Sequence, residues 1–322
     1  MAKTDTSHLA YLNGLHPSVI CRADDDLGAR CLIADSGASF GQWFASLKHE
    51  DFNLRNNVNP LTNEASRGWI GGQHLPTGAT QHDYASSLGH FVKSDIDKIQ
   101  QTASRVSDAI DSLDLDAFVR KLVWSPSLGK VNALRILNGC ERYSRARRRT
   151  KAPTDAVALC IPMCVSAGVP ADALMARAAV ALAAADILMD YGFAVEVWAY
   201  AYSTNIFNSS GGNKHRDALA AVRLKASDEP LNEALAASGA SAWFYRTGLF
   251  AAWEVMSNND ESGGLGQAIA LDNRKAENVA RVMGLQQAHI MRGGNPFSVE
   301  SAIDATLKDL KQALETWTEG AV

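Results

Sequence analysis

The chain has 322 residues, of which 47% are hydrophobic and 20% are charged, and its net charge is −4. This length can bury a sizeable core in one large domain or two ordinary ones, and the composition excludes a disordered or fibrous chain. The small net charge excludes a protein whose overall field would recruit nucleic acid or a membrane. Residues 1–14 lack a basic start followed by an apolar core, and the five cysteines form no CxxC pair, so we expect a cytoplasmic protein with reduced thiols and no membrane contact.

The first segment, 1–36, is predicted to be irregular apart from one short strand at 30–34. It leads into Gly37-Ala-Ser39-Phe-Gly41, and a GxSxG pattern between a strand and a helix is typical of the nucleophile elbow of α/β-hydrolases. In those enzymes several strands precede the elbow, whereas almost none precede Ser39. The same residues form Ser39-x-x-Gln42, a capping box at a helix start. We therefore expect Ser39 to cap a helix, and a Ser39 hydrolase is a third functional alternative.

Helical periodicity follows between 81 and 115, where apolar residues recur at three- and four-residue steps. This pattern predicts a mostly helical N-terminal region over 1–125. A basic connector is predicted over 126–152, because arginines crowd around one tyrosine there. Arginine can grip phosphates while tyrosine stacks on a base, so RNA or DNA binding is a second functional hypothesis, with a solvated linker as its alternative. The cluster consists of Arg142, Tyr143, Arg145, Arg147, Arg148 and Arg149.

The clearest fold pattern lies between 156 and 201. An apolar run at 156–163 predicts a strand that is buried on both faces. An Ala- and Leu-rich segment at 171–191 predicts a helix, and 193–201 predicts a second strand. A strand, a helix and a strand of these lengths form a right-handed βαβ unit whose two strands are parallel.

Further elements complete an α/β fold over 153–322. The sequence predicts a strand at 217–226, helices between 228 and 283, a short strand at 285–291 and a terminal helix at 299–317. This order predicts a Rossmann-like, mainly parallel sheet flanked by helices. Ligands of such sheets bind at the carboxyl ends of the strands, so the loop rim at that edge is the predicted partner-binding surface. Its predicted residues are Cys164, Ser166, Gly168, Ser203, Asn205, Asn208, Asn213 and Asn295.

The order strand, helix, strand, strand, helix, helix, strand, helix resembles a von Willebrand factor A-like domain. The resemblance implies a metal-ion-dependent adhesion site of the form Asp-x-Ser-x-Ser in the loop after the first strand. At the matching positions this chain has Pro162, Cys164 and Ser166. Without the carboxylate, no anionic ligand offsets the dehydration of a divalent ion. We therefore expect a degenerate site that binds no metal, and we expect no other cofactor.

Short motifs are spread along the chain: Ser39-Phe-Gly-Gln-Trp43, Arg67-Gly-Trp-Ile-Gly-Gly72, Val131-Asn-Ala, Leu137-Asn-Gly139, Val165-Ser-Ala-Gly-Val169, Tyr191-Gly-x-x-Val-Glu-Val197, Trp243-Phe-Tyr-Arg-Thr-Gly-Leu-Phe250 and Gly264-Leu-Gly-Gln267. With them, most of the chain resembles a family of phage and prophage proteins that carry a degenerate A-like domain. The resemblance implies a protein of the bacterial host cytoplasm, or one associated with the virion, and no catalytic residues. The leading expectation is a non-enzymatic protein-interaction or scaffold protein with an unidentified protein partner.

Overall fold

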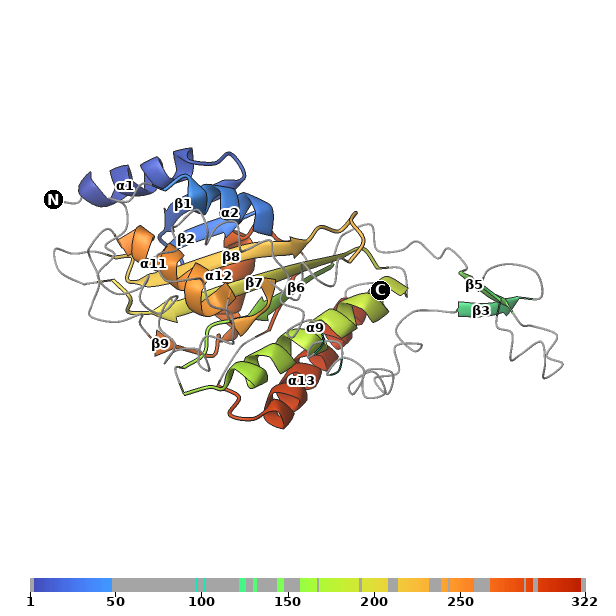
Figure 1. Ribbon diagram of the computed structural model, residues 1–322. Coiled ribbons are helices and arrows are strands. Elements are labelled where there is room, and N and C mark those ends of the chain that lie inside the picture. Colours follow the sequence, from blue (N-terminus) through green and yellow to red (C-terminus); the bar gives the residue numbers. More distant parts are fainter. Residues whose placement is uncertain are drawn as a thin grey trace.

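The computed structural model describes most of the chain outside its second quarter (Figure 1). The described residues are 3–47, 97, 101, 122–125, 130–131, 144–147, 157–166, 168–190, 193–207, 214–231, 239–242, 244–257, 267–286, 288–291 and 295–319. The helices are α1 (Lys3–Gly14), α2 (Gly37–Ala45), α9 (Ala171–Asp190), α11 (Phe250–Ser257), α12 (Asn273–Val282), α13 (Val299–Glu319) and the π-helix η3 (Phe244–Leu249). The strands are β1 (Val19–Asp24), β2 (Ala29–Ala34), β3 (Leu122–Ser125), β4 (Lys130–Val131), β5 (Ser144–Arg147), β6 (Val157–Pro162), β7 (Val195–Thr204), β8 (Asp217–Lys225), β9 (Gln267–Ala268) and β10 (Ala288–Ile290).

Seven of the described strands form one sheet in the order β1-β2-β8-β7-β6-β10, with β9 paired to β7. β6 is parallel to both β7 and β10, and β2 is parallel to β8. The pairs β1–β2, β7–β8 and β7–β9 are antiparallel, so the sheet is mixed and the expectation of a mainly parallel sheet is corrected. The connection 205–216 is short and rich in Asn, Ser and Gly, which suits a direct return of the chain rather than the helical crossover that a parallel pair needs.

Helices cover both faces of this sheet. One face packs against α1, α2, α9, α11 and α13, and the other packs against α12. Residues of β6 alternate between the two cores: Leu159 and Ile161 enter the first, whereas Ala158 and Cys160 enter the second. All six residues of β6 are buried for this reason, which explains its unbroken apolar sequence. The predicted βαβ unit of β6, α9 and β7 is confirmed, with its two strands parallel.

The described residues 3–47 contain two strands as well as two helices. The short strand predicted at 30–34 is confirmed as β2, whereas the expectation that the rest of 1–36 is irregular is corrected by α1 and β1. β1 and β2 form an antiparallel hairpin whose turn includes Gly28 at φ +65°, a backbone conformation that glycine adopts without strain. β2 then pairs with β8 on its other side, with Ala34 opposite Val222. All six residues of β2 are buried as a result. The first part of the chain thus wraps onto the main sheet.

A second, three-stranded antiparallel sheet has the order β3-β5-β4. Figure 1 shows β3 and β5 at the far right, apart from the main sheet. Most of 48–156 lies outside the described residues, including the predicted helical segment 81–115, so the division of the chain at 125 and 152 stays a prediction. Within the described ranges, no helix combines the length and the hydropathy that a membrane span requires.

Candidate functional site: the loop rim at the carboxyl ends of β6, β7 and β10

The carboxyl ends of β6, β7 and β10 lie at the same edge of the sheet, because these strands are parallel. The helices that follow β6 and β10, α9 and α13, pack on the same face of the sheet and against each other. Ligands of open α/β sheets bind outside the carboxyl ends of the strands, so this edge is the candidate site. The described part of this loop rim consists of 163–166, 168–169, 203–207, 291 and 295–298.

A buried arginine holds the start of the loop after β6. Arg177 comes from the middle of α9, and its Nη1 donates a hydrogen bond to the carbonyl oxygen of Pro162 at 2.9 Å. Burial lowers the pKa of Arg177 from the ordinary arginine value, but an arginine this basic stays protonated in a protein. A positive charge therefore lies against the end of β6 at Pro162, the position that matches the aspartate of the Asp-x-Ser-x-Ser motif.

The hydroxyl of Tyr245, from η3, fixes the next part of the loop. It accepts a hydrogen bond from the backbone N–H of Val165 at 3.2 Å, and it lies 3.5 Å from the carbonyl oxygen of the same residue. Tyr245 is buried, and burial raises the pKa of its phenol well above the ordinary value. The hydroxyl is consequently neutral at physiological pH, and it can both donate and accept.

Beneath the loop, the thiol of Cys164 lies within hydrogen-bonding distance of the hydroxyls of Tyr245 and Ser203. Burial raises the pKa of Cys164 to about 12, and these two hydroxyls offset only part of that effect. A thiol with such a pKa is almost entirely protonated at neutral pH, so it is a poor nucleophile and a poor metal ligand. Cys164 and Ser203 are 7% and 0% exposed, and both belong to the interior of the rim rather than to its surface.

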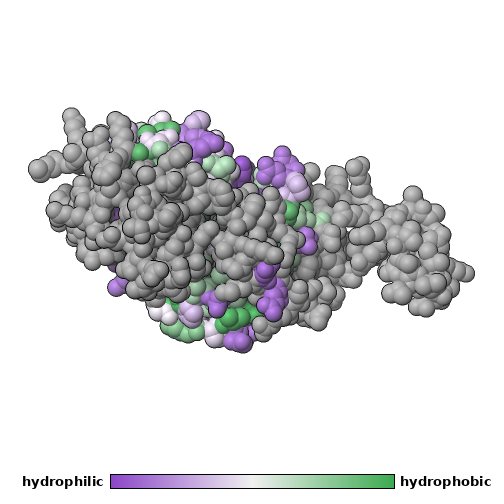
Figure 2. Space-filling model, viewed as in Figure 1, coloured by the Kyte–Doolittle hydropathy of each residue, from purple (hydrophilic) through white to green (hydrophobic). Residues whose placement is uncertain are grey.

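Two further contacts connect the loop after β6 to its surroundings. Arg246 of η3 is buried, and its Nη2 donates to the carbonyl oxygen of Val169 at 2.6 Å. The backbone N–H of Ser166 donates to Oδ1 of Asn295 at 2.8 Å, which joins the loops that follow β6 and β10. Phe297 lies two residues further on, with 68% of its surface exposed. Figure 2 shows hydrophobic and hydrophilic residues side by side over the lower end of the α9–α13 pair.

The rim ends beyond β7 in a turn that Asp217 holds. Asn205 has φ 57°, and its backbone N–H donates to Oδ1 of Asp217 at 3.1 Å. The hydroxyl of Tyr202 donates to Oδ2 of the same carboxylate, and Nζ of Lys275 lies 3.7 Å from it. Burial, together with this hydrogen bond to Asp217, raises the pKa of Tyr202. The turn is thereby fixed while Asn205 itself is exposed.

The predicted rim residues fall into three groups. Ser166 is half-buried, and Gly168, Asn205 and Asn295 are exposed, so these four lie at the surface. Cys164 and Ser203 lie beneath it. Asn208 and Asn213 lie outside the described residues. Sequence reasoning missed the side chains that hold the rim in place, although one of them had a visible signal, since Arg177 is the only lysine or arginine in the sequence of α9. The missed supporting residues are Arg177, Tyr245, Arg246 and Asp217, and the exposed Phe297 was missed as well.

The model of one protein family, the "Domain of unknown function (DUF7192)", matches residues 44–288, which is about three quarters of the chain. The chain belongs to the DUF7192 family. The DUF7192 match includes the rim residues of 163–169 and 203–207, together with α9, η3 and α12. The rim residues after β10, and α1, β1, β2 and α13, lie outside it. No curated protein and no solved structure matches the chain.

Ser39 lies just before the DUF7192 match, in the first turns of α2. The N-cap of this helix is Ser36, whose Oγ accepts from the backbone N–H of Ser39 at 3.0 Å. The expectation that Ser39 itself caps the helix is therefore wrong by three residues. The hydroxyl of Ser39 donates to Oδ1 of Asp35 at 2.6 Å and lies 2.8 Å from Oγ of Ser36. Gln42, the other half of the expected capping box, binds Nε2 of His16 instead.

The basic cluster lies within the DUF7192 domain. Arg145 and Arg147 are residues of β5, the central strand of the second sheet. The other cluster residues, Arg142, Tyr143, Arg148 and Arg149, lie outside the described residues. The register pairs Arg145 with both Trp124 of β3 and Lys130 of β4. An aromatic residue and a second basic residue thus flank Arg145 across the sheet.

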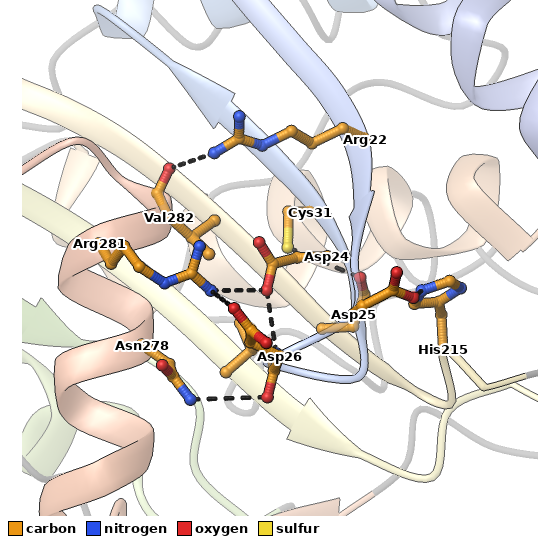
Figure 3. A network of polar contacts seen from close by, with 11 residues as sticks. Arg22, Asp24, Asp25, Asp26, Cys31, His215, Asn278, Arg281 and Val282 are labelled. Carbon is orange, nitrogen blue, oxygen red and sulfur yellow. Dashed lines mark hydrogen bonds and ion pairs between the residues drawn. The ribbon is translucent and has the colours of Figure 1, made fainter.

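An acidic turn, 24–28, connects β1 and β2 ahead of the DUF7192 match and contacts residues within it (Figure 3). Asp24 accepts from Nη2 of Arg281, on α12, at 2.8 Å, and Asp26 lies 3.4 Å from the same nitrogen. Asp25 lies 2.9 Å from Nε2 of His215. These contacts attach the hairpin turn to α12 and to the segment before β8. Among the residues that the structure describes, no group of three His, Cys, Asp or Glu side chains could hold a metal ion.

Proposed function

We propose that this DUF7192 protein is a non-enzymatic interaction or scaffold protein of phage or prophage origin, which binds a protein partner through the loop rim of a metal-independent, A-like domain. The observation that carries the proposal is that buried side chains hold the rim from below while its outer residues stay exposed. Tyr245 and Arg246 hold Val165 and Val169, whereas Asn295 and Phe297 face solvent.

Preorganisation is the physical reason why this arrangement favours binding. A loop that is already fixed loses little conformational freedom when a partner binds, so more of the contact energy appears as affinity. Asn295 presents a polar side chain that joins two loops, and Phe297 presents an exposed aromatic ring close by. Exposed aromatic residues at the centre of an interface often contribute most to its affinity.

The protonation states of the rim side chains favour a non-enzymatic role. Cys164 is the nucleophilic side chain nearest to the end of β6, and its pKa is raised to about 12. The pKa of Tyr245 is also well above the ordinary value. General acids and bases work best when their pKa lies near the operating pH, and neither group meets that condition.

Arg177 supports binding without a metal ion. Its guanidinium donates to the carbonyl of Pro162 at the end of β6, and this positive charge repels a divalent cation from the place where the A-like resemblance would put one. The A-like architecture itself is supported by the β6–α9–β7 unit, whose first strand ends at this loop. The phage or prophage origin rests on the resemblance of the sequence motifs.

Affinity capture with matched variants tests the proposal. The full chain is immobilised and exposed to a lysate of its native host, with and without EDTA. We expect one specific partner that is retained in EDTA, lost with Phe297→Ala and weakened with Asn295→Ala. The matched control is Ile20→Ala, which removes another exposed apolar side chain on β1, far from the rim. A partner that both rim variants retain, or that only Mg²⁺ retains, contradicts the proposal.

A further inference from the structure

The acidic turn 24–28, between β1 and β2, contacts the segment that leads into β8. The backbone N–H of Asp217, the first residue of β8, donates to the carbonyl oxygen of Gly28 at 3.1 Å. Two residues earlier, Nε2 of His215 lies 2.9 Å from Oδ1 of Asp25. A turn near the start of the chain is therefore attached directly to the beginning of β8, beside the rim.

Asp217 connects this acidic turn to the rim turn at Asn205. Its Oδ1 accepts from the backbone N–H of Asn205 at 3.1 Å, and its Oδ2 accepts from the hydroxyl of Tyr202. Asn205 has φ 57°, which is an uncommon conformation for a residue other than glycine. Such a conformation persists only where the surrounding contacts fix it. The rim turn at Asn205 thus depends on the position of Asp217.

The acidic turn is itself held by contacts that open easily. Arg281 of α12 pairs with Asp24 at 2.8 Å and with Asp26 at 3.4 Å (Figure 3). The side chains of Arg281 and Asp26 are 47% and 75% exposed, and that of Asp25 is 85% exposed. Exposed ion pairs contribute little to stability, and salt screens them. Local opening of this turn should therefore cost much less free energy than global unfolding.

We propose that the acidic turn 24–28 is a salt-sensitive clamp on the rim turn at Asn205. While Arg281 holds the acidic turn on α12, Asp217 is in place and Asn205 keeps its left-handed conformation. When the acidic turn detaches, the rim turn loses its order. Because such coupling is reciprocal, a partner that binds the ordered rim turn also holds the acidic turn on α12. Only this consequence rests on the proposed function, since the clamp operates in the free protein.

Amide hydrogen exchange of the full-length protein, measured by NMR, tests the clamp without a partner. In Arg281→Glu a carboxylate faces Asp24 and Asp26, so exchange at Asn205 and Asp217 should become about 3- to 10-fold faster at low salt. Raising the salt concentration from about 50 to 500 mM should then have opposite effects. It screens attraction in the unaltered protein and speeds exchange there, whereas it screens repulsion in Arg281→Glu and slows exchange there. Arg281→Lys should behave as the unaltered protein does.

Arg274→Glu is the matched control, because it makes the same charge change at an exposed position of α12. It should leave exchange at Asn205 unchanged at both salt concentrations. Exchange at Leu159, in the buried strand β6, reports global stability and should respond much less than exchange at Asn205 in Arg281→Glu.

Three results would overturn the clamp: equal exchange at Asn205 in the two charge-reversed variants, equal acceleration at Leu159 and Asn205, or a salt response of the same sign in the unaltered protein and in Arg281→Glu. If any of these occurs while Phe297→Ala still abolishes partner capture, the proposed function stands without the clamp. If Asn205 responds as expected but no partner is captured, the clamp stands and the proposed function fails.

Discussion

The guanidinium carbon of Arg30 lies 4.0 Å from the centroid of the Phe207 ring, in a position where neither side chain is exposed. The same guanidinium donates through Nη1 to the carbonyl oxygens of Met256 and Ser257 at 2.8 and 3.1 Å, at the carboxyl end of α11. A cation at a helix carboxyl end is favourable because it meets the negative end of the helix dipole. Arg30 therefore connects the N-terminal hairpin to the segment that follows β7 and to α11.

Replacing Arg30 tests this connection. Arg30→Met keeps most of the side-chain volume but leaves two buried carbonyl groups without their donor, so we expect the free energy of unfolding to fall by about 2–4 kcal/mol. Arg30→Lys should lose less, because it keeps the charge. Urea denaturation measures both variants against Arg274→Met on the exposed face of α12, which should change stability by less than about 0.5 kcal/mol. Equal effects of Arg30→Met and Arg274→Met would show that the connection contributes nothing.

The hydroxyl of Tyr245 should matter mainly for the order of the loop after β6. Tyr245→Phe keeps the ring in its aromatic contacts with Phe250 and Trp253 and removes the acceptor of the Val165 N–H. We expect a loss of about 1–2 kcal/mol and faster amide hydrogen exchange at Val165, measured by NMR. Exchange at Val197, in the centre of the sheet, should change only by the global loss of stability. Unchanged protection of Val165 would contradict the assigned role of Tyr245.

The described thiols should be unreactive in the folded protein. Burial raises the pKa of Cys21, Cys31 and Cys164 to about 12, and it raises that of Cys160 further. At pH 8 roughly one molecule in 10,000 then carries a thiolate at a given site. We expect iodoacetamide to label these four cysteines only after denaturation, as read by mass spectrometry of the tryptic peptides. Rapid labelling of Cys164 in the native protein would refute its placement beneath the rim.

Asp24 should make stability depend on pH. Burial favours a higher pKa for this carboxyl, but hydrogen bonds from Arg281 and from the backbone N–H of Leu27 outweigh it, so the pKa lies below the ordinary value of 3.8. Its contribution to stability is therefore complete above that value and is lost as the pH falls through the folded-state pKa. Because half of Arg281 is exposed, we expect Asp24→Asn to cost no more than about 1 kcal/mol at pH 7.

Thermal unfolding between pH 7 and pH 2 measures this effect. The difference between the unaltered protein and Asp24→Asn should shrink towards the acidic end, and high salt should also reduce it. Asp304→Asn, at an exposed position of α13, provides the control. A constant difference across the whole pH range would mean that ionisation of Asp24 is not the source of the stability.

Gly28 should resist substitution because of its backbone conformation. Its φ is +65°, and a methyl group added there would meet the carbonyl oxygen of Lys214 at an ordinary contact distance of 3.6 Å. Space is therefore not the limit. We expect Gly28→Ala to lower the free energy of unfolding by about 1 kcal/mol and Gly28→Asn to lower it less, since asparagine tolerates a positive φ better than alanine. Equal stability of all three proteins would argue against this turn geometry.

Elements with a strong local pattern were predictable from the sequence. β6 is a continuous apolar run because it is buried on both faces, and α9 is rich in alanine and leucine because it lies between the sheet and α13. Neither pattern contains the direction of a neighbouring strand, so the antiparallel pairing of β7 with β8 was missed. β1 was missed as well, because only Val19 and Cys21 are fully buried in it and its other residues are polar or exposed.

The site was only partly predictable for a related reason. Ser166 and Asn295 were both assigned to the rim from the general rule for parallel strands, and the structure brings them into contact. Tyr245 comes from a segment 80 residues away from Val165. No periodicity in one segment reveals that its hydroxyl completes a loop in another. The N-cap at Ser36 was missed because Ser36 and Ser39 both precede an apolar run, and sequence spacing alone does not choose between them.

The long separation between β2 and its partner β8 has a consequence for synthesis. Ala34 pairs with Val222, and at translation rates of about 5–20 residues per second, roughly 10 to 40 s pass between the emergence of the two residues from the ribosome. During that interval β1 and β2 have an apolar surface and an open strand edge without their final neighbour. The β1–β2 hairpin thus waits for its partner strand during synthesis, and a nascent-chain chaperone has time to bind it there.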